Sequence, residues 1–325
     1  MAFIWDIVMI LVQSIKDCMQ WLIPHGLMDQ RYLNKSNEKY KIGNEIRNYF
    51  LTLNNNDCDL ELSEIIHYFK DSKFTSIPYD FTKKYRQKHI GAFYDNSCHM
   101  CFVLHSGKKL YFPKEWSLEA ASNYYNSLLL EQDEESPHRY ETEEYTVKNG
   151  EVIVDVGAAE GIWALTYAEK AAKIYLFECE KPWIVALQKT FEPWREKVVI
   201  VNKYVSNINT RNETTIDEYF KNKEINFIKA DIEGAEIKLL QGSARILSMD
   251  NQLKLLLCSY HKKNDADELR IILEKEGFMT EYSKRYIIFI HDKELSAPYV
   301  RKGLIRARRD SAFIQRISPA LCKSF

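Results

Sequence analysis

From Glu151 onward the sequence alternates between short apolar segments and amphipathic segments with helical spacing. The apolar segments are EVIVDVGA, KIYLFECE, VVIVNKYVS, INFIKADI and LKLLLCSYH. Continuous apolar strands separated by helices are typical of a parallel sheet that is covered on both faces. FMTEYS and YIIFIHD have no helix between them, so we expect an antiparallel pair that closes the sheet. The sequence therefore predicts an α/β fold with a doubly wound, mostly parallel, seven-stranded, Rossmann-like sheet.

The part of the chain before this sheet predicts an N-terminal α+β domain. Residues 36–70 carry a helical apolar stripe, and the β-like runs between residues 90 and 112 suggest a hairpin that turns at Ser106-Gly107. A helix is expected from Trp116 to about Leu130, followed by the polar stretch EQDEESPH. We expect residues 1–140 to bind a substrate or partner, 141–293 to form the sheet domain, and 294–325 to be a basic C-terminal extension.

Residues 1–23 are apolar enough to raise the question of a membrane span. Asp6, Lys16 and Asp17 interrupt them, whereas a spanning helix needs about 20 apolar residues. They also lack the basic start and small-residue cleavage site of a signal peptide. Apolar residues recur at helical spacing, which predicts an amphipathic helix. The sequence leaves two alternatives for this helix. It either packs on the protein's own core or rests on the surface of a membrane.

Charge and cysteine content narrow the class of protein. The formal net charge of the 325 residues is −1, whereas a dedicated nucleic-acid binder needs a positive surplus. The seven cysteines are odd in number and scattered, which favours a reducing cytoplasm over a disulfide framework. Cys98 and Cys101 have metal-ligand spacing but no second pair follows them, so we expect them to pack within a strand.

Candidate binding residues stand where the first two strands of the sheet end. Open α/β sheets bind ligands at the carboxyl ends of their strands. The first strand ends at Asp155, followed by Gly157 and Gly161, and glycines allow a sharp turn close to a ligand. Glu178 ends the second strand, 21 residues after Gly157. A carboxylate about 20 residues beyond the first glycine can accept hydrogen bonds from both hydroxyls of a ribose.

The charge of the loop indicates which nucleotide it would bind. A dinucleotide fingerprint needs three glycines, and this loop has only Gly157 and Gly161. Asp155 and Glu160 disfavour a pyrophosphate and suit a cationic ligand. S-adenosylmethionine carries an ammonium and a sulfonium and no phosphate. The sequence therefore predicts S-adenosylmethionine as the cofactor.

The fourth and fifth strands end in residues suited to proton transfer. Asp231 follows the fourth strand, and His261 ends the fifth, where the two should face each other. A histidine at this edge is a candidate general base because its pKa lies near neutral pH. Glu236 is either functional or a helix cap. The fifth strand ends without the acidic and amide ligands that magnesium favours, so we expect no metal.

At this point the residues resemble a known family. DVGAAEG, the strand end at Glu178, TTIDEYF and FIKADIEGAE together resemble the FkbM-type S-adenosylmethionine-dependent methyltransferases. The resemblance covers roughly residues 151–278, and KADIEGAE is its most specific part. A mostly parallel sheet that ends in an antiparallel pair is the arrangement of class I methyltransferases. The segments SPHRY and PYVRKGLIRA are similar to a bacterial branch of the family.

The resemblance implies O-methylation, commonly of sugar or polyketide hydroxyls. By motif match, the aspartate and glycines of the loop would hold the methionine part of the cofactor, Glu178 would hold the ribose, and Asp231 would lie near the transferable methyl. The catalytic candidates are Asp231 and His261. The candidate cofactor-binding residues are Asp155, Gly157, Ala159, Gly161, Glu178, Ser206 and Asp231. Of these, Ala159 and Ser206 are added to the residues that the motif match names.

The chain departs from the family pattern at three positions. Ala159 stands where the family usually has Asn, and Glu160 stands where an apolar residue is common. Ser259 replaces a Glu that often precedes the fifth-strand histidine by two residues. The cofactor prediction survives these changes. The acceptor is expected to be a small-molecule or glycan hydroxyl, with no nucleic acid involved.

Other functions remain as alternatives. A short-chain nicotinamide dehydrogenase needs Tyr-x-x-x-Lys well after the glycine loop, and the matches starting at Tyr79 and Tyr219 are misplaced. A nucleic-acid methyltransferase usually has an Asn/Asp-Pro-Pro-aromatic turn, which Lys229-Ala230-Asp231-Ile232 is not. A catalytically inactive binding protein of the same fold at the inner face of a membrane stays open. The basic residues between Arg301 and Arg309 are either a solvated face or a contact for an anionic substrate or lipid headgroups.

Overall fold

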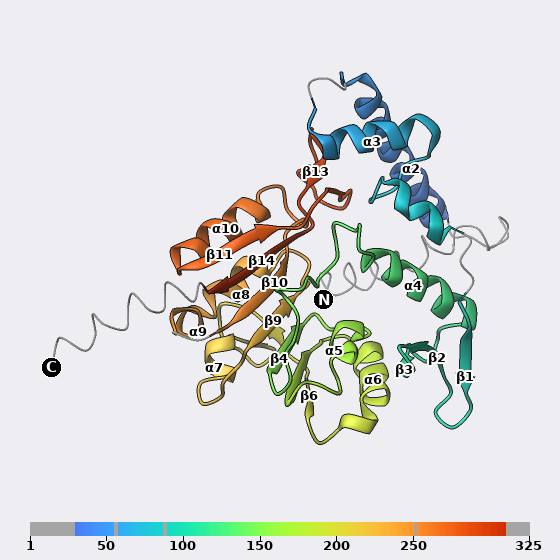
Figure 1. Cartoon of the computed structure of the whole chain (residues 1–325). Helices are drawn as coiled ribbons and strands as arrows, with labels where there is room; N and C mark the ends of the chain where they lie inside the picture. Colours follow the sequence, from blue (N-terminus) through green and yellow to red (C-terminus); the bar gives the residue numbers. More distant parts are fainter. Residues whose placement is uncertain (1–29, 55–57, 87–89, 250–251, 310–325) are drawn as a thin grey trace, which may run out of the picture.

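The computed structural model describes residues 30–54, 58–86, 90–249 and 252–309, so the helix predicted at 1–23 lies outside the described residues. A seven-stranded sheet forms the centre (Figure 1). In spatial order its strands are β11 (Phe278–Tyr282), β14 (Leu304–Arg309), β10 (Lys254–Cys258), β9 (Phe227–Ala230), β4 (Val152–Val156), β5 (Lys173–Phe177) and β6 (Val198–Val201). Only β14 runs against its neighbours. The predicted doubly wound, mostly parallel, seven-stranded α/β fold is confirmed.

Helices cover both faces of this sheet. One face carries α5 (Ile162–Thr166) and α6 (Lys181–Thr190), and the other carries α7 (Ile216–Tyr219), α8 (Glu236–Gln241), α9 (Ala244–Ser248) and α10 (Asp265–Lys275) (Figure 1). Successive strand residues alternate between the two layers, since Ile153 packs with the first group and Val154 with the second. Both faces are thus apolar, which explains why the strands read as continuous apolar runs.

The N-terminal part has two packing units. One contains α2 (Gln30–Thr52), α3 (Leu60–Asp71) and the short η2 (Asp80–Tyr85), which share a core with β12 (Ile287–Ile288). The other contains β1 (Ala92–Asp95), β2 (Met100–His105), β3 (Lys108–Tyr111) and α4 (Leu118–Glu131), whose core is continuous with that of α5 and α6. No helix within the described ranges combines the length and the apolarity that crossing a bilayer requires.

One local prediction for this part is confirmed, and a second is confirmed in part. Ser106 and Gly107 have φ angles of 48° and 79°, and His105 pairs with Lys108 across the turn, as in a two-residue hairpin. The predicted strand packing of the C-x-x-C cysteines holds for Cys101, which lies buried in β2, but is wrong for Cys98, which lies partly exposed in the turn before that strand. The Sγ of Cys101 donates to the carbonyl of Trp116 at 3.1 Å.

The predicted closing pair of the sheet is wrong. β11 does not pair with YIIFIHD, of which only Ile287–Ile288 forms a strand, and that strand pairs with β13 (Val300–Arg301) outside the main sheet. The partner of β11 is β14, which comes from the segment predicted as a basic extension. LIRARR forms an interior strand because Leu304, Ile305 and Ala307 are fully buried while its arginines find partners.

Buried arginines in β13 and β14 connect these strands to segments that lie elsewhere in the chain. Arg301 donates to the backbone carbonyls of Tyr260 and His261 and pairs with Asp292 at 2.6 Å. Arg306 in β14 donates to the carbonyls of Arg139 and Tyr140. Both side chains are buried, so neither a solvated face nor a contact for lipid headgroups describes them.

Three small elements complete the description: β7 (Tyr204–Val205), β8 (Glu213–Thr214) and η3 (Glu192–Trp194).

Candidate functional site

The glycine loop after β4 packs directly on the end of β9. Gly157, Ala159 and Gly161 have positive φ angles of 71°, 44° and 77°. A Cβ on Gly157 would lie 2.0 Å from the backbone oxygen of Asp231, so only glycine lets the two strand ends approach this closely. On Gly161, which precedes α5, a Cβ would lie 2.7 Å from Leu187. Packing within the protein therefore already requires both glycines.

Asp155 forms a buried ion pair beneath this loop. Lys229 Nζ lies 2.9 Å from Asp155 Oδ1, and the two side chains are 5% and 1% exposed. The same Nζ donates to the carbonyl of Gly157 at 3.0 Å. Burial lowers the pKa of Lys229, but the charges of Asp155 and Asp231 outweigh it and hold that pKa above its usual value. The charge of Asp155 is thus balanced inside the sheet by a lysine that the sequence prediction did not pair with it.

Glu178 lies where it was predicted, just beyond β5, with a carboxylate fixed by backbone groups. Its Oε1 accepts hydrogen bonds from the N–H groups of Cys179 and Glu180, and its Oε2 accepts one from Ala159 at 2.8 Å. Burial raises the pKa of Glu178. Burial, together with the charge of Glu178, raises the pKa of Glu180 to about 7. Glu180 Oε1 is buried and has no hydrogen-bond partner among the described residues.

Asp231 occupies the centre of the site. Its Oδ1 lies 3.4 Å from His261 Nε2, as predicted, and its Oδ2 accepts a hydrogen bond from Tyr140 at 3.1 Å. His138 Nε2 lies 3.6 Å from the same Oδ2. Burial alone would raise the pKa of Asp231, but the imidazoles of His138 and His261 outweigh it and hold the pKa well below its usual range. Asp231 is therefore an ionised acceptor surrounded by donors.

His261 is enclosed by carboxylates on two sides. Its Nδ1 lies 3.3 Å from Glu236 Oε1, while its Nε2 faces Asp231 and, at 3.8 Å, Glu233. Burial lowers the pKa of His261, but the negative charges of Glu236 and Asp231 outweigh it and raise the pKa to about 9. Glu236 also accepts a hydrogen bond from the N–H of Ile232, so it serves the turn and the histidine together.

The sequence suggested that Pro137-His138-Arg139 could reach the mouth of the site, because this segment immediately precedes the first strand, but it gave Tyr140 no role and no contact with Asp231. Both precede β4, yet their side chains reach Asp231. Two contacts with the C-terminal strands fix this segment. Arg306 binds the carbonyls of Arg139 and Tyr140, and a Cβ on Gly303 would lie 2.2 Å from the carbonyl of Pro137. The signal available in the sequence was the run SPHRY itself, whose histidine and tyrosine come just before the first strand.

Two other predicted residues have different surroundings. Glu160 is buried and accepts a hydrogen bond from Tyr124 of α4 at 3.0 Å, and burial raises its pKa to about 7. Ser206 is buried just after β7, where its N–H donates to Thr214 and its Oγ bonds Asn207. Glu160 therefore joins the acidic group at the sheet edge, whereas the contacts of Ser206 lie within the β7–β8 region.

The arrangement of the sheet is a known one. A seven-stranded sheet with one reversed strand, and with acidic residues at the carboxyl ends of β4, β5 and β9, is that of the class I methyltransferases. Residues 203–280 match the family model of the Methyltransferase FkbM domain. The match confirms, for that segment, the resemblance seen in the sequence. A search of curated proteins gave no match.

Three solved structures align with part of the chain. An FkbM methyltransferase from Methylobacillus flagellatus KT is 16% identical, with a TM-score of 0.41, over 58% of this chain and 54% of that one. The chain thus aligns with about half the length of that protein. A precorrin-6y C5,15-methyltransferase from Geobacter metallireducens GS-15 is 13% identical, with a TM-score of 0.35 over 50% and 83%. A ribosomal protein L11 methylase from Lactobacillus delbrueckii subsp. bulgaricus is 13% identical, with a TM-score of 0.34 over 51% and 74%.

Proposed function

We propose that the protein is an S-adenosylmethionine-dependent methyltransferase that acts on a hydroxyl group. The observation that carries the proposal is the acidic group at the carboxyl edge of the sheet, with Asp231 at its centre. This edge is where open α/β sheets bind ligands. The FkbM-like segment includes Asp231 and His261, and residues of α4 and the following segment complete the site.

The residues present fit the proposed cofactor. Glu160, Glu178 and Glu180 are carboxylates whose pKa values burial raises, so a cationic ligand would stabilise their ionised forms. The unpartnered Oε1 of Glu180 offers a further acceptor. Glu178 uses three of its roughly four acceptor positions for backbone N–H groups, which leaves one for a ribose hydroxyl. When bound, the cofactor supplies a methyl group on a sulfonium.

We assign the proton acceptor to Asp231. The sequence predicted His261 for this role, but each of its ring nitrogens faces a carboxylate oxygen, an arrangement that suits a doubly protonated imidazolium. His261 is then a positioning residue that holds Asp231. Asp231 accepts the hydrogen bond of the incoming hydroxyl and takes its proton late, once the forming carbon–oxygen bond has made that oxygen strongly acidic.

A sugar or other small polyol is our proposed acceptor. Tyr260 and Phe289 lie in edge contact with ring centroids 5.3 Å apart, both are partly exposed, and Phe289 also contacts His261. Aromatic faces next to a few polar groups are typical of small-ligand sites. A groove of about 830 Å³ beside β11 and β14, apart from these residues, is lined by eight glutamates and four basic residues, an unfavourable surface for a phosphate backbone.

Glu178→Ala is expected to weaken binding of S-adenosylhomocysteine at least about tenfold, because a charged hydrogen-bond acceptor for the ribose is lost. Calorimetric titration measures the effect. Glu196→Ala is the control, since the Glu196 side chain is 91% exposed, and it should bind like the wild type. Folded wild-type protein that binds no S-adenosylhomocysteine would overturn the proposed function.

Asp231→Asn is expected to lower turnover about 100-fold, because the amide keeps the size of the carboxylate but cannot take a proton. Affinity for S-adenosylhomocysteine should stay within about threefold, which separates loss of proton transfer from loss of the cofactor site. Transfer of labelled methyl to a panel of sugars provides the assay. Turnover close to that of the wild type would remove Asp231 from the chemistry.

A further inference from the structure

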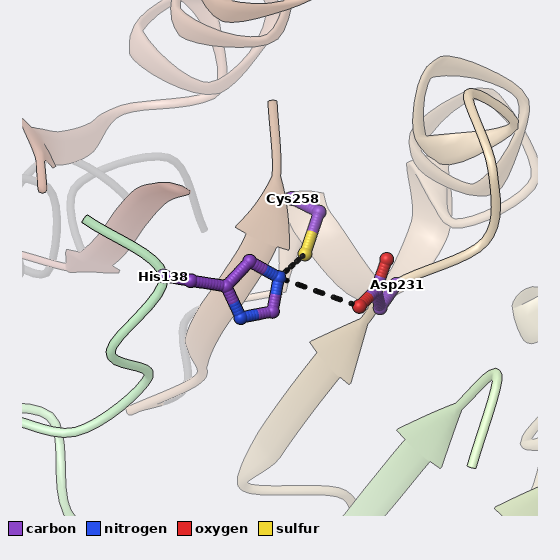
Figure 2. Close-up of side chains that lie close together, drawn as sticks. All are labelled: His138, Asp231 and Cys258. Carbon is purple, nitrogen blue, oxygen red and sulfur yellow. Dashed lines mark hydrogen bonds and ion pairs between the residues drawn. The ribbon is translucent and has the colours of Figure 1, made fainter. Parts of the chain in front are cut away.

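Three side chains from separate segments converge at the carboxyl edge of the sheet (Figure 2). His138 precedes β4, Asp231 follows β9, and Cys258 is the last residue of β10. Cys258 Sγ and Asp231 Oδ2 each lie 3.6 Å from the same atom, His138 Nε2. Their nitrogen, oxygen and sulfur atoms all lie within 4.8 Å of one another.

This geometry differs from that of a hydrogen-bonded catalytic triad. In a triad the carboxylate binds one ring nitrogen and the nucleophile faces the other. Here the carboxylate and the thiol face the same nitrogen, so the three groups point toward one common position (Figure 2). Neighbouring ligands of a tetrahedral zinc ion are about 3.3–3.6 Å apart, given metal–ligand bonds of about 2.0–2.3 Å. The two measured separations are at the upper end of that range.

The surrounding groups are arranged as an outer shell. His138 is 5% exposed, and its Nδ1 has no hydrogen-bond partner within the described part of the chain. That nitrogen faces Glu131 Oε2 at 3.9 Å, on the side where metal-binding histidines usually have a carboxylate. Asp231 is oriented by Tyr140 at Oδ2 and by His261 at Oδ1. Ligating carboxylates are commonly held in this way.

We propose that His138, Asp231 and Cys258 bind a divalent transition metal of the zinc type, with a fourth position open to the acceptor oxygen. One imidazole, one carboxylate and one thiolate suit zinc or cobalt rather than magnesium. The end of the fifth strand lacks the acidic and amide ligands that magnesium favours, but a thiolate and an imidazole suit zinc. On binding, the thiol of Cys258 releases its proton to solvent and the thiolate sulfur forms the bond to the metal.

The catalytic role of the metal rests on the proposed function, whereas the binding of the metal to these three residues does not. A hydroxyl bound at the open coordination position of the metal would be polarised and its pKa lowered, which makes the oxygen a better nucleophile at neutral pH. Asp231 would then contribute one oxygen to the metal while the other faces His261, and the proton of the metal-bound hydroxyl would leave to solvent. Three protein ligands with one open position are typical of catalytic rather than structural zinc sites.

The test is a titration of chelator-treated, reduced full-length protein with Co²⁺, followed by displacement with Zn²⁺. We expect one equivalent of Co²⁺ and the absorption band of a cobalt–thiolate bond. Cys258→Ser should abolish that band, and both Cys258→Ser and His138→Gln should weaken Zn²⁺ binding at least about 100-fold. Cys101→Ser is the matched control, because Cys101 is also a buried strand cysteine but binds the Trp116 carbonyl instead.

The outcomes separate this site from the proposed function. Circular dichroism and thermal unfolding establish that each variant is folded. No stoichiometric thiolate-bound cobalt in the wild type, or equal binding by folded Cys258→Ser, overturns the metal site. S-adenosylhomocysteine is titrated into the same apoprotein as a separate readout. Cofactor binding without metal binding rejects only the metal site, and metal binding without cofactor binding rejects only the methyltransferase.

Discussion

Lys229→Met is expected to lower the free energy of unfolding by about 3–5 kcal/mol, the usual cost of removing one partner of a buried ion pair. The substitution leaves Asp155, which is 1% exposed, without the ammonium 2.9 Å away. It also removes the donor to the carbonyl of Gly157, which opens the glycine loop. Urea unfolding, analysed at constant m-value, measures the change.

A matched ion pair on the surface provides the control for this substitution. Lys221 lies 2.9 Å from Glu218, the same separation, but these side chains are 60% and 56% exposed. Lys221→Met should cost less than about 1 kcal/mol. Adding Asp155→Asn to Lys229→Met should recover part of the loss, because no buried charge then lacks a partner. Equal costs for the buried and exposed lysines would contradict the argument.

Gly157→Ala is the second substitution with a large expected effect, at about 3 kcal/mol or more. The alanine would have to adopt a φ of 71°, which costs about 1–2 kcal/mol by itself. Its Cβ would also lie 2.0 Å from the backbone oxygen of Asp231, so β4 and β9 would have to separate. Because Asp231 moves with that backbone, we also expect a loss of methyl transfer.

Gly107→Ala isolates the steric part of this effect. Gly107 has a similar φ of 79°, but nothing lies within 4 Å of a Cβ built there. It should therefore lose only the conformational cost of about 1–2 kcal/mol. Comparison of unfolding midpoints and turnover for the two variants is the measurement. A Gly157→Ala variant as stable and active as Gly107→Ala would show that the loop and β9 are not in close contact.

The sheet was predictable because its pattern is local. Each parallel strand is a continuous apolar run, and all but β6 are followed directly by a helix, so periodicity was sufficient for β4, β5, β6, β9 and β10. Apolar periodicity did not predict β14, because LIRARR carries three arginines, one of which, Arg306, is buried. A buried arginine is tolerated only where carbonyl or carboxylate oxygens accept its N–H groups. Those carbonyls belong to Arg139 and Tyr140, far away in the chain.

The same distinction separates the parts of the site that were predicted from those that were missed. Glu178, Asp231 and His261 end strands, and strand ends of a parallel sheet meet at one edge, so their proximity follows from topology. His138 and Tyr140 belong to no strand, and their approach to Asp231 depends on tertiary contacts. The pairing of Lys229 with Asp155 required the register between β4 and β9, which places these two residues opposite each other.

The position of β14 affects how the protein is made. The ribosome delivers β10 and β11 before β14, yet β14 lies between them and is the strand through which β11 joins the sheet. Until residues 304–309 emerge, the nascent chain therefore carries bare strand edges, which are templates for pairing with other chains. Synthesis of residues 259–303 is thus the aggregation-prone interval, when a chaperone that shields such edges has its greatest effect on yield.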